Sequence, residues 1–239
     1  MGDICLKVNN LVSSYRNFKI SHITFDLKNG DILGLVGRSG SGKSTLIKTL
    51  IGLKKLNAGK INFFLNANKI NYKSVLGYSP QENSLFPFLT LEENILTFAR
   101  LHGMKTKDIK ERMKYLLARL DLKYSKSKKI NELSGGMKKR ADLAVTLIHD
   151  PQIIILDEPF NGLDISLQRF IWELLKEFAE QGKIIIISSH MLSDIQKNCT
   201  QIGLIEKGTY YDTNELVKGL KSKGETSLEV FLDRLFSRR

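Results

Sequence analysis

Long apolar runs are missing from this chain of 239 residues, although 42% of its residues are hydrophobic. No run approaches the ~20 apolar residues that a membrane-spanning helix needs, and the start Met1–Lys7 lacks the form of a signal peptide. Any membrane role is therefore expected to come through a partner. The length allows one domain with a full core and leaves no room for a second domain of the same kind.

Cysteine is also scarce. Cys5 and Cys199 stand alone in an otherwise ordinary composition. This pattern predicts reduced, structural thiols in a cytoplasmic protein, and a cysteine-based metal site would need more ligands nearby.

Acidic residues are few in one segment, Arg100–Arg140. It holds fourteen Lys or Arg against four acidic residues, so it carries +10 of the formal net charge of +12. Two interpretations stay open, a solvated lysine-rich surface or a contact with an anionic partner. Only Tyr115 and Tyr124 are available there to stack on bases, so an anionic membrane surface is favoured over nucleic acid as that partner.

The strongest motif is rich in glycine and lies between an apolar run at Asp31–Val36 and a helical pattern at Ser44–Ile51. It reads Gly37, Arg38, Ser39, Gly40, Ser41, Gly42, Lys43, Ser44, Thr45. Glycines at this spacing let the backbone wrap a phosphate chain and direct its N–H groups inward. Lys43 is expected to reach the β- and γ-phosphates, and Ser44 to ligate Mg²⁺. The order of strand, loop and helix argues against a mere turn.

Two carboxylates follow the apolar run Ile153–Leu156 directly. A buried parallel strand of this kind delivers acidic groups to the carboxyl edge of its sheet. Asp157 is expected to join the Mg²⁺ shell held by Ser44, and Glu158 to act on the attacking water as general base or orienter. His190, at the end of the strand Lys183–Ile187, either reaches a γ-phosphate or is structural.

Two further polar positions are candidates because of their surroundings. Tyr15 is expected in a polar loop between strands at Ile4–Val8 and Lys19–Leu27, where it stacks on an adenine or is simply exposed. Gln81 follows a strand at Ser74–Ser79. The loop after it carries four exposed-looking apolar residues, Leu85, Phe86, Phe88 and Leu89, which suggests that it covers or contacts something.

Helical patterns follow this loop. Thr90–Glu93 is a capping box, and a second helix is expected at about Lys107–Leu120. A third opens at Leu133–Met137 with paired glycines, which are costly there unless the backbone approaches a ligand. With Ser134 as cap, the N–H groups of Gly135 and Gly136 predict a second anion-binding helix end, although a plain helix start is the alternative. Beyond the core, a hairpin at Lys207-Gly208 and helices near Thr213–Leu220 and Ser227–Phe236 are expected.

In order and spacing, this set resembles the ATP-binding cassette (ABC) family across nearly the whole chain. The matching residues are Tyr15 as the adenine-stacking aromatic, Gly37–Thr45 as Walker A, Gln81 as a catalytic and metal-contacting residue, Ser134, Gly135 and Gly136 of the signature, Asp157 and Glu158 of Walker B, Asp164 of the D-loop, and the switch histidine His190. Met137 and Asn161 depart from the usual family residues and are similar to those of the branch that energises drug, lipid and polymer exporters. Thr200 stands where the family often has an Asp after the Cys, and the sequence assigns no consequence to this change.

The resemblance implies an α/β fold of the P-loop NTPase type within a single ABC ATPase domain at 1–239. It further implies a mainly parallel core sheet, an N-terminal antiparallel β subdomain, an inserted helical subdomain at about 90–150 and a short C-terminal helical extension at about 212–239.

It also implies a subunit that binds and hydrolyses ATP with Mg²⁺ to energise a membrane exporter. Two chains, as a homodimer or a heterodimer, would clamp ATP head to tail and dock on a separate transmembrane permease at the inner face of the cell membrane. The alternative is a soluble ABC ATPase acting in cofactor assembly, translation or DNA repair. Translation-type members usually carry two cassettes and repair-type members a long coiled coil, and these 239 residues contain neither. A small-molecule kinase would have no use for Leu133–Met137.

Overall fold

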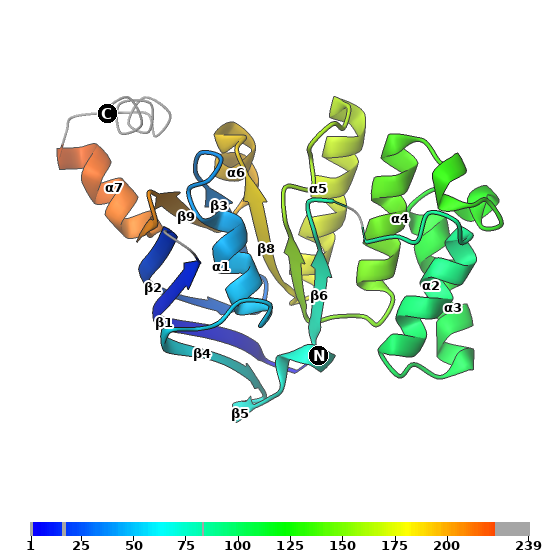
Figure 1. Cartoon of the computed structure of the whole chain (residues 1–239), viewed down its shortest axis with the longest axis horizontal. Coiled ribbons are helices and arrows are strands. Elements are labelled where there is room, and N and C mark those ends of the chain that lie inside the picture. Colours follow the sequence, from blue (N-terminus) through cyan, green and yellow to red (C-terminus); the bar gives the residue numbers. More distant parts are fainter. Residues whose placement is uncertain (1, 16–17, 83, 223–239) are drawn as a thin grey trace.

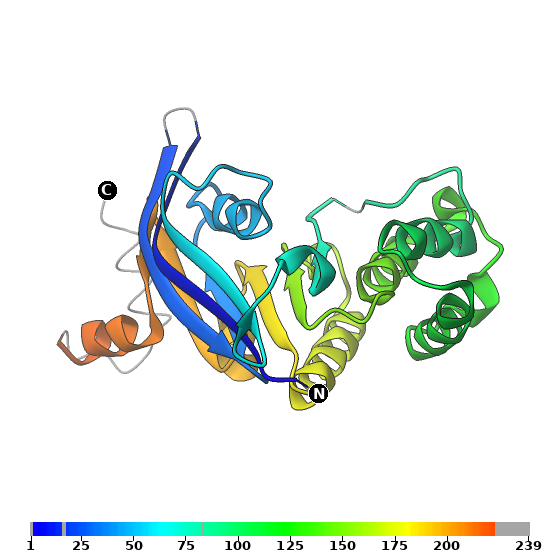
Figure 2. The same cartoon turned by 90° about the horizontal axis from the view of Figure 1, so that it is seen from below.

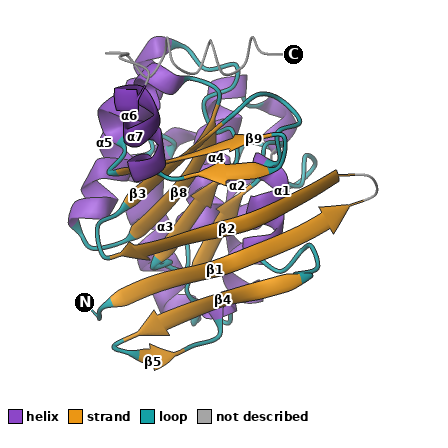
Figure 3. Cartoon of the chain, turned by 90° about the vertical axis from the view of Figure 1, so that its left-hand side faces the viewer, coloured by secondary structure: helices purple, strands orange, loops and turns teal. Residues whose placement is uncertain are grey.

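The computed structural model describes residues 2–15, 18–82 and 84–222. Its strands form one mixed sheet in the order β5-β4-β1-β2-β10-β9-β3-β8-β7-β6 (Figure 3). The strands are β1 Ile4–Tyr15, β2 Phe18–Lys28, β3 Ile32–Val36, β4 Ala58–Leu65, β5 Asn68–Lys69, β6 Leu76–Ser79, β7 Ile153–Leu156, β8 Ile184–Ser189, β9 Gln201–Glu206 and β10 Thr209–Tyr211. The expected α/β class with a mainly parallel core and antiparallel N-terminal strands is confirmed.

The parallel part of the sheet places the functional segments at one edge. Strands β3, β7 and β8 are buried along their whole length, as their apolar runs predict. In the parallel register, Ile187 of β8 pairs with Gly34 of β3 and with Leu156 of β7. The carboxyl ends of these strands therefore meet, and the segments that follow them come together there.

The antiparallel part is larger than the sequence indicates. Strand β1 continues past Val8 to Tyr15 and pairs with both β2 and β4. Register shifts near Asn9 and Asn10, where Asn10 has a φ of 47°, let the pairing continue through this polar dipeptide. Tyr15 is consequently the last residue of a strand, and its expected place in a loop is wrong.

The helices lie mostly to one side of the sheet. They are α1 Lys43–Leu50, α2 Leu91–Leu101, α3 Thr106–Arg119, α4 Gly135–Leu147, α5 Ile165–Glu180, α6 Leu192–Asn198 and α7 Thr213–Ser222, with 3₁₀ turns at Tyr72–Ser74, Lys123–Ser125 and Ile130–Glu132. Helices α2, α3 and α4 gather at the end of the molecule away from β1 and β2 (Figures 1 and 2). The expected capping box of α2 is present, because Thr90 and Glu93 each accept the other's backbone N–H.

Several local predictions need correction. Strand β6 begins at Leu76, because a 3₁₀ turn occupies the residues before it. Leu85, expected to be exposed, is 7% exposed and belongs to the main apolar core, whereas Phe86 and Phe88 are exposed as expected. Helix α6 was not expected. Helix α7 matches its prediction, and the helix expected at Ser227–Phe236 lies outside the described residues.

Within the described part of the chain, none of the helices has the length and apolar character needed to cross a bilayer.

Candidate active site

The loop between β3 and α1 has a backbone that requires glycine. Gly37 has a φ of 152° and Gly42 a φ of 120°. A Cβ atom at Gly37 would lie 2.2 Å from the carbonyl oxygen of Ile205, so a larger residue would displace the backbone of the hairpin. The Ser41 hydroxyl is buried and has no hydrogen-bond partner among the described residues.

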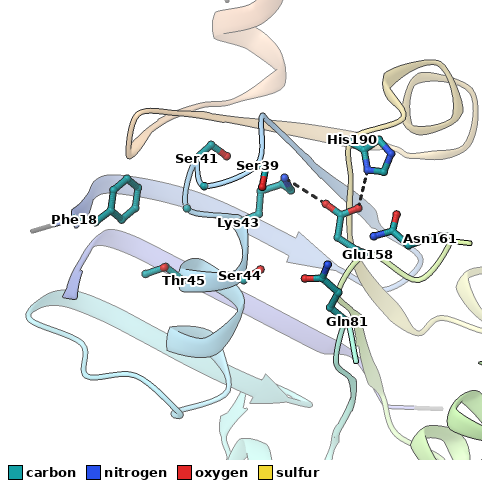
Figure 4. Close-up of a pocket in the computed structure, with 12 residues that line it drawn as sticks. Phe18, Ser39, Ser41, Lys43, Ser44, Thr45, Gln81, Glu158, Asn161 and His190 are labelled. Atoms are coloured by element: carbon teal, nitrogen blue, oxygen red, sulfur yellow. Dashed lines mark hydrogen bonds and ion pairs between the residues drawn. The ribbon is translucent and has the colours of Figure 1, made fainter. Parts of the chain in front are cut away.

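A cavity of about 270 Å³ lies beside this loop (Figure 4). Phe18 and residues 39–45 line it on the side of the loop, and Gln81, Glu158, Asn161 and His190 face them. Gly37 and Arg38 of the loop are absent from this lining, and their carbonyl oxygens accept hydrogen bonds from Lys43 instead. The structure thus brings Walker A, Gln81, Glu158 and His190 together, as the sequence predicts.

Lys43 carries the positive charge of the cavity. Its side chain is 6% exposed, and its Nζ donates to the carbonyl oxygens of Gly37 at 2.7 Å and Arg38 at 3.3 Å. The same nitrogen lies 3.3 Å from Oε1 of Glu158. Buried charges of opposite sign attract each other at this distance. The Glu158 carboxylate therefore helps to hold the Lys43 ammonium beside the loop.

Glu158 contacts three residues from other parts of the chain, Lys43, Ser188 and His190. Nδ1 of His190 lies 3.1 Å from its Oε2, opposite the contact with Lys43 (Figure 4). Its backbone has a φ of 48° and its N–H donates to Oγ of Ser188 at 2.8 Å, while the Ser188 hydroxyl donates to Oδ1 of Asp157 at 2.6 Å. One serine therefore holds the carboxylate of Asp157 and the backbone of Glu158, whose own carboxylate contacts Lys43 and His190. Ser188 was not expected at the site from the sequence, although its place beside Asp157 follows from the register of β7 and β8.

A second pocket adjoins the first and unites the three residues expected to hold Mg²⁺. Ser44, Gln81 and Asp157 line it together with Tyr78. A hydroxyl, an amide and a carboxylate form an oxygen donor set that suits a hard cation retaining several waters. Burial, with the charges of Asp157 and Asp142, raises the pKa of Tyr78 to about 12, so its hydroxyl remains neutral beside this set. Clusters of three or more His, Cys, Asp or Glu able to hold a metal do not occur in the described residues.

The aromatic residue in the cavity is not the expected one. Tyr15 does not line it; its ring is 51% exposed and carries the Nζ of Lys54 at 3.9 Å. Phe18, its cross-strand partner in β2, lines the cavity, and a Cβ at Gly42 would lie 3.1 Å from the Phe18 ring. Phe18 and Tyr15 are paired residues of neighbouring strands. The sequence could therefore have identified Phe18 as the aromatic in the cavity only if the register of β1 and β2 had been known.

The signature and the D-loop lie elsewhere. Ser134 is exposed and caps α4 by accepting the N–H of Met137 at 3.3 Å, and Asp164 caps α5 by accepting the N–H of Leu167 at 2.9 Å. Hydrogen bonds from Ser166 and Leu167 lower the pKa of Asp164. A Cβ at Gly136 would lie 2.9 Å from the Leu167 side chain, so the two helix starts are neighbours. Ser134, Gly135, Gly136 and Asp164 are absent from the lining of the loop cavity.

Comparison with known proteins identifies the class to which this site belongs. Residues 20–161 match the family described as ABC transporter. The chain therefore belongs to the ABC transporter family.

Individual relatives are named as ATP-binding proteins. The chain is 36% identical over 192 residues to the Nod factor export ATP-binding protein I of Rhizobium sp., covering 79% of this chain and 63% of that relative. It is 32% identical over 207 residues to the linearmycin resistance ATP-binding protein LnrL of Bacillus subtilis, covering 85% of this chain and 67% of that protein. The chain thus spans less than two thirds of the length of the first of these relatives.

Solved structures share the fold. An ATP binding subunit of an ABC transporter superposes with a TM-score of 0.84 at 26% identity, covering 97% of this chain and 99% of the other. A nucleotide-free ATP-binding cassette superposes with a TM-score of 0.77 at 21% identity, covering 96% of this chain and 99% of the other. The expected P-loop NTPase fold of the ABC ATPase type is confirmed.

Proposed function

We propose that this protein is the ATP-binding and ATP-hydrolysing subunit of a membrane transporter, of the exporter kind. The observation that carries the proposal is the convergence of Lys43 and His190 on the largely buried carboxylate of Glu158, beside the glycine loop. Its relatives in Nod factor export and linearmycin resistance support the exporter assignment.

The reaction proposed is transfer of the γ-phosphoryl group of ATP to water. The N–H groups of the loop and the ammonium of Lys43 bind the phosphates and offset their charge. Glu158 orients the attacking water and accepts its proton, because its carboxylate is held by Lys43 and His190 and projects into the cavity. His190 then holds Glu158 and the γ-phosphate in register, and Phe18 provides the surface nearest to the loop for the adenine ring.

The donor set of the adjoining pocket fits Mg²⁺. Ser44, Gln81 and Asp157 would hold the ion, which would supply positive charge at the β- and γ-phosphates. Ser188 orients Asp157 for this role by donating to one carboxylate oxygen, which leaves the other oxygen available.

The signature residues are proposed to act on the ATP of a second chain. The exposed N–H groups at the start of α4, with Ser134 and the neighbouring Asp164, offer a helix end to an anion that does not come from the same chain's loop. Two chains, identical or related, would then bury two ATP molecules head to tail. Hydrolysis would release the pair, because the triphosphate that joins the two helix ends is cleaved.

The partner is proposed to be a separate transmembrane permease that holds the protein at the inner face of the cell membrane. Phe86 and Phe88, 47% and 77% exposed, lie in the loop that begins at Gln81 and provide an apolar contact for it. We treat the chain as one ATPase domain at 1–239, with a helical subdomain at about 90–150 and a C-terminal extension at about 212–239.

The Glu158→Gln variant tests the central assignment. The amide keeps the shape of the side chain but does not accept a proton, so hydrolysis should fall by about 10²- to 10⁴-fold while ATP binding persists. Size-exclusion chromatography with Mg-ATP should then reveal a stable dimer. Glu111→Gln, at an exposed position of α3, is the matched control and should behave as wild type. A monomeric Glu158→Gln protein with wild-type turnover would refute the proposal.

A further inference from the structure

One buried carboxylate outside the cavity joins the Gln81 segment to the signature helix. Asp142 lies on α4 with no exposed surface. Its Oδ2 accepts the hydroxyl of Ser79, the last residue of β6, and its Oδ1 accepts the N–H of Ser84 at 3.3 Å and the Ser84 hydroxyl at 3.4 Å. Ser79 and Ser84 stand on either side of Gln81 in sequence. A single side chain thus holds both ends of the stretch that carries Gln81.

Lys139 completes the cluster from the same helix. Its Nζ donates to the Ser79 hydroxyl oxygen at 3.2 Å and lies 3.7 Å from Oδ2 of Asp142, with a side chain that is 11% exposed. The carboxylate therefore keeps a counter-ion and accepts three hydrogen bonds, which a buried charge needs to be tolerated. Burial lowers the pKa of Lys139, and the charge of Asp142 acts in the opposite direction.

The same helix packs against the strand before Gln81. A Cβ at Gly77 of β6 would lie 2.6 Å from the carbonyl oxygen of Thr146, so α4 and β6 are in backbone contact. The Thr146 hydroxyl donates to the carbonyl oxygen of Asp142 at 2.8 Å and extends the link toward Tyr78. Asp142 lies about two helical turns from Ser134, and a rigid helix transmits any displacement between them.

From this geometry we propose that Asp142 is a positioning residue that fixes Gln81 relative to the signature, so that the two move as one body. The inference rests on the proposed function, because it assigns regulation to the same nucleotide site. Displacement of Gln81 by a nucleotide would shift the start of α4, where the second chain's ATP is to bind. Conversely, docking at the start of α4 would set the position of Gln81 in the first site.

The first test measures the link itself and needs no nucleotide. In Asp142→Asn, the amide nitrogen replaces one acceptor oxygen, so at least one end of the stretch loses its anchor. Amide hydrogen exchange of Ser84, whose N–H donates to Asp142, should accelerate by about 10-fold when followed by NMR, with the amides of β6 unchanged. Leu143→Ala is the control, because it removes a buried neighbour on α4 that offers no polar group to this stretch. Equal exchange in Asp142→Asn and wild type, or equal acceleration in Leu143→Ala, overturns the proposal.

The second test measures the consequence by a double-mutant cycle. Asp142→Asn and Gln81→Ala should each lower kcat by roughly 10-fold with KM nearly unchanged, and the double variant should be no slower than Gln81→Ala alone. Leu143→Ala should instead multiply with Gln81→Ala. Additive effects of Asp142→Asn, or a normal kcat in either single variant, contradict the inference. Ser79→Ala repeats the cycle with a milder change if Asp142→Asn folds poorly.

Failure of the proposed function would be recognised separately. A wild-type chain without ATP turnover would refute that function, whereas the exchange measurement would still decide whether Asp142 anchors the stretch.

Discussion

Two helices of this protein begin with a glycine-rich segment, and their surroundings differ. At the start of α1, Lys43 is 6% exposed and contacts two carbonyl oxygens and the carboxylate of Glu158. At the start of α4, Ser134 and Gly135 are exposed, and a Cβ added at Gly135 would meet nothing within 4 Å among the described residues. Both ends offer N–H donors to an anion, but of the two only the first has Glu158 and His190 beside it among the described residues.

The difference indicates that a helix end with free N–H donors becomes a reaction site only when neighbouring strands place charged side chains beside it. The carboxyl ends of β7 and β8 do this for α1, because the parallel register sets Asp157 and Ser188 beside the loop. The start of α4 lies beside the start of α5, which brings Asp164. This arrangement supports the proposal that the second end acts on the nucleotide of another chain.

The largest effect is expected from a substitution at the start of α1 that weakens nucleotide binding. Lys43→Ala removes a buried cation from the phosphates, so the affinity of the isolated chain for Mg-ATP should fall by about 100-fold. Titration with calorimetric detection measures it, after thermal unfolding has shown that the variant folds. Lys60→Ala, at an exposed position of β4, is the control. Undiminished affinity in the Lys43 variant would remove the basis of the site.

The next effect should separate the two ends. Gly135→Asp places a carboxylate at the start of α4, where it suits the helix dipole but repels a triphosphate. Binding of Mg-ATP to the single chain should be unchanged, whereas turnover should fall by more than about 10-fold and the Glu158→Gln dimer should not form. Gly135→Ala is the control, since the structure leaves room for a methyl group there. Normal turnover of Gly135→Asp would argue that α4 binds no nucleotide.

A moderate effect is expected where the Gln81 loop is proposed to meet the permease. Replacing both Phe86 and Phe88 with Ser should leave basal hydrolysis intact and weaken binding to membranes that contain the partner by roughly 10-fold or more, because apolar contact area is lost. Co-sedimentation measures the binding. Leu53→Ser, at a position 69% exposed on another face, is the matched control. Retained sedimentation of the double variant would count against this contact.

A smaller effect concerns the stability of the far end of α4. Burial lowers the pKa of His149 to about 4, and its ring stacks on that of His102 at 3.6 Å. The unfolded chain therefore takes up the proton first, so the stability from neutral His149 is complete above about pH 6.5 and is lost as the pH falls toward 4. His149→Gln should reduce the stability lost between pH 7 and pH 4.5 by ~2 kcal/mol in urea unfolding.

His22→Asn serves as the control for this measurement. His22 is exposed, and its φ of 57° is one that asparagine tolerates. An unchanged pH dependence in His149→Gln would mean that another group accounts for the acid sensitivity. Neither substitution should alter nucleotide binding at pH 7, which keeps this effect apart from the first helix end.

The smallest effect is expected from the basic segment Arg100–Arg140. Of its fourteen cations, five are paired with carboxylates, namely Arg112, Arg119, Lys126, Lys139 and Arg140. The remaining charge should give weak binding to anionic vesicles at low ionic strength, at about 1 kcal/mol per close cation, and release near ~0.5 M salt. Lys128→Glu with Lys129→Glu should weaken it, whereas Lys60→Glu should not. Equal, negligible sedimentation with anionic and neutral vesicles would favour a merely solvated surface.

The sequence predicted a feature correctly where that feature depends on residues close to one another in the chain. The loop at Gly37–Thr45, the acids at Asp157 and Glu158 and the capping box at Thr90 were predicted correctly in position, since each motif is contiguous and its local geometry follows from residue type. The error at Tyr15 arose because a bulge at Asn10 prolongs β1, and a bulge depends on the partner strand. Leu85 was misjudged for a similar reason, because helices from other parts of the chain cover it.

By itself, the sequence determined the parallel core, the phosphate loop and the chemical types available at the site, because hydrophobic period and short-range steric rules act within a few residues. Tertiary structure alone decided that Phe18 and not Tyr15 faces the cavity, that Ser188 holds the Asp157 carboxylate and the Glu158 backbone, and that Asp142 joins α4 to the stretch with Gln81. These arrangements depend on strand register and helix packing between distant segments, and neither quantity is encoded in any one stretch of the chain.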